Sequence, residues 1–148
     1  MLFAARMAPQ PIRLHYENAA GRLSEQVEGR RDGHIVVEYV AGPRQLGDLQ
    51  TLLGYAKRLL ALRGWHKVLG DQRWMEPFTP EEEQWVIDLW LNVSYPRTTA
   101  LIGAVVLHPD VFAQLSDDVV QAQAQVSAMS YRLFDDPATA KAWLEQLP

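Results

Sequence analysis

The chain has 148 residues, of which 48% are hydrophobic and 22% are charged, as in an ordinary globular domain that buries its own core. It contains no cysteine, which excludes disulfides and thiolate chemistry and leaves only His and carboxylates as zinc ligands. Its formal net charge of −4 argues against nucleic acid as a partner, because phosphate binding needs a basic face.

The length of the chain favours one domain. We expect residues 1–10 to form a flexible tail and residues 11–148 to form a single domain. The tail lacks a leading basic region, and Arg6 interrupts its short apolar run, so it makes a poor signal peptide. No apolar run approaches the length of a membrane span. Together with the lack of cysteine, this predicts a cytoplasmic protein.

Three antiparallel strands are predicted at the start of the domain. Apolar and polar residues alternate over residues 12–17 and, less cleanly, over residues 23–28, which is the period of a half-buried strand. Asp32-Gly33 is a hairpin turn signal, and the β-branched residues of 34–40 predict the third strand.

The middle of the chain alternates helices with buried strands. Leucines at helical spacing predict a helix over residues 46–64, and a short buried strand follows over residues 65–70. A capping box and a proline mark the start of a second helix over residues 80–93. The continuous apolar run of residues 99–107 predicts a central strand that is buried on both faces.

The end of the chain adds two helices and one strand. Pro109 starts the first of these helices, whose second half, residues 121–125, is polar and small. A short strand from Tyr131 then leads to Asp136, which caps a final amphipathic helix. The resulting order βββ-α-β-α-β-α-β-α predicts an α/β fold. Its mixed sheet is antiparallel at the start and partly parallel later, and about four helices pack on it.

A family resemblance covers about residues 34 to 147 and rests on four motifs that follow one another from Asp71 onwards. They are Asp71-x-Arg73; Thr79-Pro80-Glu81-Glu82, followed by Trp85 and Trp90; Pro109-x-Val111-Phe112, after a buried strand; and Phe134-Asp135, followed by Ala140, Trp143 and Leu144. In this order they resemble the SpoIIAA-like members of the STAS superfamily. That family consists of small bacterial domains whose fold is akin to that of anti-sigma-factor antagonists.

The resemblance implies a STAS-like fold and a non-catalytic domain that regulates or binds another protein. In the antagonists, a serine at a helix start is phosphorylated, and the comparable position here is Thr79. The Asp-Ser-Ser-Gly context of that serine is missing, and the carboxylates of residues 81–83 would repel a phosphate. We therefore expect Thr79 to act as a plain helix cap.

The sequence predicts no catalytic residue, metal site or cofactor. It has neither a Gly-x-Ser-x-Gly nucleophile elbow nor a glycine-rich phosphate loop. Its four histidines stand at no metal-binding spacing, and we expect His15 and His34 on the wetter faces of their strands.

The loop after the strand over residues 65–70 is the candidate binding site, because ligands gather at the carboxyl ends of strands in open α/β sheets. Asp71 and Arg73 either pair with each other or hold a polar ligand. Trp74, Met75 and Phe78 would add an apolar wall.

The helix over residues 81–93 is apolar around most of its circumference, which leaves two interpretations. Either neighbouring segments cover it, or it is a partner surface that gives a two-fold homodimer or binds another protein. A second candidate function is the carriage of a small lipophilic ligand. Its pocket would be lined by Trp74, Met75, Phe78, Trp85 and Trp90. A third is an enzyme that uses Asp71 and Arg73.

Overall fold

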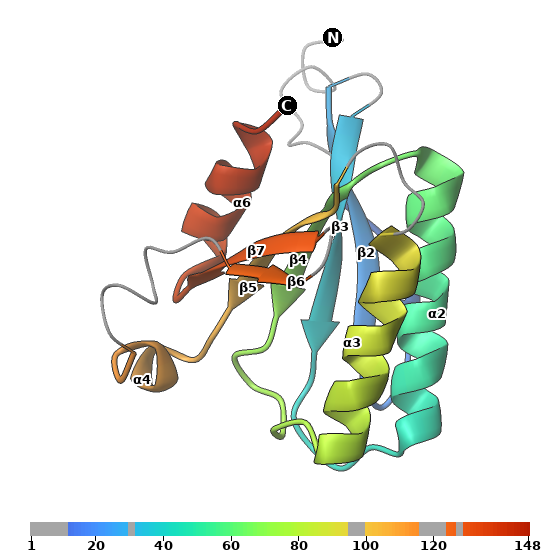
Figure 1. The fold of residues 1–148 in the computed structure, drawn as a ribbon, viewed down its shortest axis with the longest axis vertical. Coiled ribbons are helices and arrows are strands. Elements are labelled where there is room, and N and C mark those ends of the chain that lie inside the picture. The colour runs from blue at the N-terminus through green and yellow to red at the C-terminus, as the bar shows by residue number, and fades with distance from the viewer. Residues whose placement is uncertain (1–11, 30–31, 95–99, 116–123, 127–128) are drawn as a thin grey trace, which may run out of the picture.

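A computed structural model describes residues 12–29, 32–94, 100–115, 124–126 and 129–148 (Figure 1). The predicted tail, residues 1–10, lies outside the described residues. A mixed sheet of seven strands forms the centre, in the order β1-β2-β3-β4-β5-β7-β6. The strands are β1 (Ile12–Glu17), β2 (Gly21–Glu28), β3 (Asp32–Tyr39), β4 (Lys67–Asp71), β5 (Ile102–Val106), β6 (Ala124–Val126) and β7 (Met129–Phe134).

The sheet changes from antiparallel to parallel at β3. Strands β1, β2 and β3 form an antiparallel meander, whereas β3, β4, β5 and β7 run parallel to one another. Strand β6 then pairs antiparallel with β7 at the far edge. The predicted α/β class, with a mixed sheet that is antiparallel first and partly parallel later, is confirmed.

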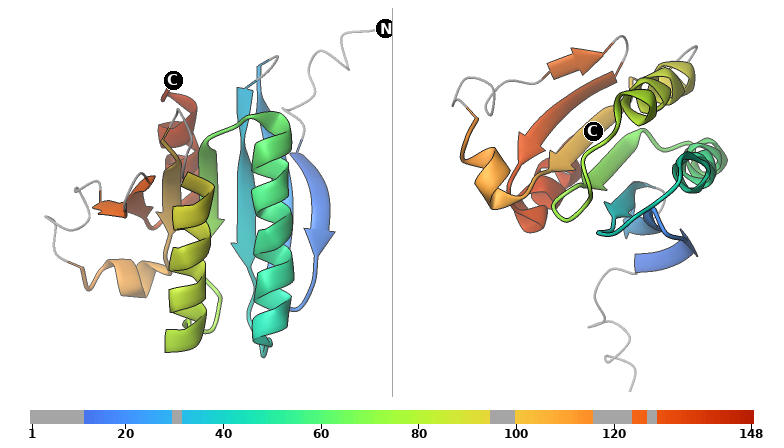
Figure 2. Two further views of the ribbon diagram at one scale, coloured as in Figure 1. Left: turned by 45° about the vertical axis from the view of Figure 1, so that its right-hand side comes forward. Right: turned by 90° about the horizontal axis from the view of Figure 1, so that it is seen from below.

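Helices cover both faces of this sheet. The helices among the described residues are α2 (Leu46–Arg63), α3 (Pro80–Ser94), the short α4 (Pro109–Phe112) and α6 (Pro137–Glu145), of which α2, α3 and α6 pack on the sheet. Helix α2 joins β3 to β4, and α3 joins β4 to β5, so the two crossovers step in the same direction across the sheet. Right-handed crossovers of this kind place their helices on the same face. Figure 2 shows α2 and α3 side by side on one face and α6 on the other.

The hydrophobic core therefore has two parts. The larger part lies between α2 and strands β2 and β3, and it includes the fully buried Leu23, Ile35, Val37, Leu49, Leu52, Leu53 and Leu60. The smaller part lies under α6 and contains Leu69, Ala104, Val106, Phe134, Ala140 and Leu144. Ala140 and Leu144 lie on the predicted apolar stripe of α6. Trp143 of the same stripe is only partly buried, with its ring centroid 5.5 Å from that of Phe134.

The predicted helix over residues 109–125 is wrong at its end. Helix α4 is a single short turn, and residues 124–126 form the edge strand β6, in which Gln125 lies opposite Ser130. Residues 121–125 carry no apolar stripe that would hold a helix against the sheet. Residues 116–123 lie outside the described residues.

Within the described part of the chain, no helix has both the length and the apolar character needed to cross a bilayer.

Candidate functional site

Asp71 and Arg73 pair with each other at the carboxyl end of β4. The Asp71 carboxylate accepts hydrogen bonds from Arg73 Nε at 3.0 Å, Nη2 at 2.9 Å and the Arg73 backbone N–H at 3.1 Å. Asp71 is almost fully buried, and its side-chain hydrogen bonds to the Arg73 guanidinium raise the pKa of Arg73. Of the two predicted arrangements, the structure contains the internal pair, which organises the loop after β4.

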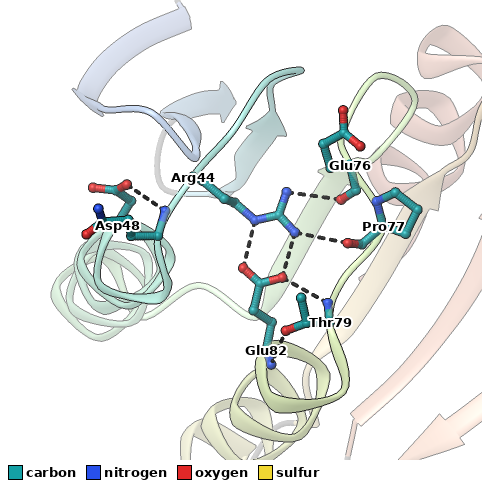
Figure 3. Close-up of polar contacts among 7 residues, drawn as sticks. Arg44, Asp48, Glu76, Pro77, Thr79 and Glu82 are labelled. Atoms are coloured by element: carbon teal, nitrogen blue, oxygen red, sulfur yellow. Dashed lines mark hydrogen bonds and ion pairs between the residues drawn. The ribbon is translucent and has the colours of Figure 1, made fainter.

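A second ion pair ties the start of α2 to the start of α3 (Figure 3). Arg44, in the loop between β3 and α2, donates from Nε and Nη2 to the two carboxylate oxygens of Glu82, at 2.9 and 2.8 Å. It also donates to the backbone carbonyls of Glu76 and Pro77, at 3.0 and 3.3 Å. The Arg44 and Glu82 side chains are only 5% and 7% exposed. This pair therefore joins the loop before α3 to the loop before α2.

Thr79 caps α3, as its spacing from Glu82 predicts. The Glu82 backbone N–H donates to Thr79 Oγ1 at 3.1 Å, and Glu82 Oε1 accepts from the Thr79 backbone N–H at 2.9 Å. The Glu82 carboxylate thus accepts hydrogen bonds from both the Thr79 backbone N–H and the Arg44 guanidinium. The hydrogen bonds from Arg44 are the main reason that the pKa of Glu82 lies below its usual value.

Beside these pairs, an apolar hollow of about 360 Å³ lies between α3 and strands β5 and β7. Val105 of β5 and Leu133 of β7 line it, whereas the alternate residues Val106 and Phe134 pack under α6 on the opposite face. The full lining is Tyr39, Gln72, Phe78, Glu83, Val86, Ile87, Trp90, Val105, Leu107, Tyr131 and Leu133.

A second hollow, of about 380 Å³, adjoins the first near the start of α3. Both are lined by Gln72, Phe78, Glu83 and Leu107, so they form one continuous depression, which we call the α3 groove. The second hollow is completed by Arg73, Met75, Pro77, His108 and Val111.

The structure brings together some of the predicted apolar residues and not others. Phe78 lines both hollows, Trp90 lines the first and Met75 lines the second. Trp74 is 55% exposed and lies outside the groove, with its ring 5.2 Å from that of His108. Trp85 lies outside it too and packs against the larger core.

Helix α3 combines the two predicted interpretations of its apolar surface. Trp85 and Leu89 pack against the core, whereas Ile87 lines the groove. Val86 and Trp90 contact both. The helix is therefore partly covered within the chain and partly turned towards the groove.

Sequence reasoning missed Arg44 and the strand residues of the groove. Arg44 stands 38 residues before Glu82, and no local pattern joins the two. The alternation of residues 131–134 was the available signal for Tyr131 and Leu133. It does not tell which face of β7 the helices leave uncovered.

A separate charged cluster lies at the amino ends of the parallel strands β3 and β4. His34 Nδ1 is 2.6 Å from Glu28 Oε2, and Lys67 Nζ donates to Glu28 Oε1 at 3.1 Å. His34 is 1% exposed, so the expectation that it faces the wetter side is wrong. Burial lowers the pKa of His34 below its usual 6.5.

We expect this buried histidine to make stability depend on pH near neutrality. Between the lowered pKa and about 6.5 the unfolded chain binds more protons, so the free energy of unfolding should fall as the pH drops below about 6.5. Glu25 and Glu82, whose pKa values are lowered from 4.5, act below this window. Urea unfolding at each pH should show a shallower fall for His34→Gln. Equal slopes for the two proteins would contradict the prediction.

No group of three or more His, Asp or Glu side chains that could hold a metal ion occurs among the residues that the structure describes.

Comparison of the chain with protein families, curated proteins and solved structures finds no match. The resemblance to SpoIIAA-like domains therefore stays a prediction, carried by the sequence motifs.

Proposed function

We propose that the protein is a non-catalytic domain that binds a partner protein in the α3 groove and thereby regulates it. The observation that carries the proposal is made at the carboxyl ends of the parallel strands, where paired carboxylates lie next to an apolar groove. The carboxylates of Asp71 and Glu82 are held by arginines of the same chain. Beside them lies an open depression with mostly apolar walls. Catalysis by Asp71 would need a carboxylate that can reach a substrate proton, whereas three N–H groups of Arg73 already occupy it.

We also propose that the protein is a STAS-like domain and that it acts in the cytoplasm of a bacterium. Its support is the order of the four motifs, together with an α/β fold whose mixed sheet is antiparallel first and partly parallel later. The absence of cysteine suits a reducing compartment.

The partner is either a second copy of this chain, in a homodimer, or another protein. Charge favours another protein. Besides Glu82, which Arg44 already pairs, helix α3 carries Glu81, Glu83 and Asp88, and it contains no Lys or Arg. A two-fold contact of α3 with its own copy would bring these like charges together, which is unfavourable.

A small lipophilic ligand is the second candidate, favoured by the apolar lining around Phe78, Trp90 and Leu133. Pockets for such ligands usually enclose most of the molecule. Among the residues that the structure describes, the α3 groove is instead open along one side, which fits a segment of a protein better. Native mass spectrometry separates the two candidates, because a carrier should retain its ligand.

A matched pair of substitutions tests the groove. Ile87→Glu and Gln84→Glu each add one carboxylate to α3, the first in the groove and the second at an exposed position outside it. Peptides selected on the wild type from a displayed random library should bind Ile87→Glu at least about tenfold more weakly, because an unpaired charge would enter an apolar contact. They should bind Gln84→Glu unchanged.

Circular dichroism would confirm that both variants fold. Peptides that ignore Ile87→Glu, or a wild type that selects none, would overturn the proposal.

A further inference from the structure

We infer that the segment that fills the α3 groove is basic and apolar, with a Lys or Arg side chain on Glu83 and apolar side chains on either side of it. This inference rests on the proposed function and specifies the chemistry of the partner at the same site.

Glu83 is the charge that distinguishes this groove. It lines both hollows, and it is the single charged residue among the described residues that line the first one. None of the described side chains forms an ion pair or hydrogen bond with its carboxylate. The preceding residue, Glu82, is by contrast held on both oxygens by Arg44. Glu83 therefore offers a carboxylate to a partner, where Glu82 does not.

The rest of the groove suits a cation attached to an apolar chain. At the far end of the second hollow, Arg73 is already paired with Asp71 and adds little free positive charge. The rings of Phe78 and Trp90 lie along the walls. Aromatic faces attract Lys and Arg side chains, and Arg44 of the same chain already lies 5.6 Å from the centroid of the Phe78 ring. A ligand that carries a carboxylate would instead meet the like charge of Glu83.

The position of Glu83 sets the spacing within the partner. Glu83 and Trp90 lie seven residues apart on α3, which is about 10 Å along the helix axis. An extended segment covers that distance in about three residues, and a helical one in about seven. The basic residue of the partner should stand at one of these two separations from an apolar anchor in the first hollow.

Charge reversal at matched positions tests the inference. Glu83→Lys and Glu81→Lys each reverse a carboxylate in the first turn of α3, so both lose the same favourable interaction with the helix dipole. Glu83 lines the groove, and Glu81 does not. Peptides selected on the wild type should be rich in Lys and Arg. They should bind Glu83→Lys at least about tenfold more weakly and Glu81→Lys within about twofold. A peptide whose central Lys is exchanged for Glu should recover binding to Glu83→Lys.

The outcomes separate this inference from the proposed function. If the peptides lose binding to Ile87→Glu but not to Glu83→Lys, the inference of a basic partner is wrong, whereas the groove remains the binding site. Peptides that ignore both variants would overturn both proposals. A wild type that selects no peptide, but forms a dimer in light scattering that Ile87→Glu dissociates, would show that a second copy fills the groove and overturn the inference.

Discussion

Replacement of Arg44 by Met should destabilise the protein by about 3–5 kcal/mol, because Glu82 would remain as a buried carboxylate without its partner. The same substitution removes the two hydrogen bonds that hold the carbonyls of Glu76 and Pro77. Urea unfolding measures the loss. The double variant Arg44→Met, Glu82→Leu should cost clearly less than Arg44→Met alone, because it leaves no unpaired charge.

Arg22→Met provides the control for this prediction. Arg22 pairs with Glu17 at 3.3 Å, but the side chains are 51% and 57% exposed. Exposed pairs contribute about 0–1 kcal/mol. If Arg44→Met and Arg22→Met lowered the free energy of unfolding equally, the Arg44–Glu82 pair would contribute no more to stability than an exposed pair.

Leu144→Ala should cost about 2–5 kcal/mol, since Leu144 is fully buried between α6 and the sheet and its truncation leaves a cavity. Leu62→Ala makes the same chemical change on α2 at a side chain that is 75% exposed, and it should change stability by less than about 0.5 kcal/mol. Thermal or urea unfolding compares the two variants. A Leu144→Ala protein as stable as Leu62→Ala would mean that α6 contributes little to the core.

Local patterns predicted the positions of most elements of this fold. The alternation over residues 12–17 did not predict burial, because Ile12 and Leu14 are 66% and 51% exposed. The leucines of α2 and the alternation in β1 belong to elements that lie where the sequence placed them. Strand β6 was missed because its three residues are held by pairing with β7, and residues 121–125 show neither period. Edge pairing of this kind depends on a neighbouring strand rather than on local composition.

The candidate site was predicted less completely than the fold. The loop after β4 was found because it follows a buried strand, and Met75 and Phe78 do line the groove. Arg44, Tyr39 and Tyr131 come from distant parts of the chain, and only the folded sheet brings them to one edge. Trp74 and Trp85 match the predicted residue type, but neither lines the groove, since Trp74 is 55% exposed and Trp85 packs against the larger core.

The central claim is that the α3 groove is the surface that binds a partner. The most direct measurement is a titration of methyl-labelled protein with a selected peptide, followed by nuclear magnetic resonance. The methyl signals of Val86, Ile87 and Leu133 in the groove should shift on binding, and those of the exposed Leu62 on α2 should not. Shifts at Leu62 with unchanged groove signals would contradict the claim and place the binding surface on α2.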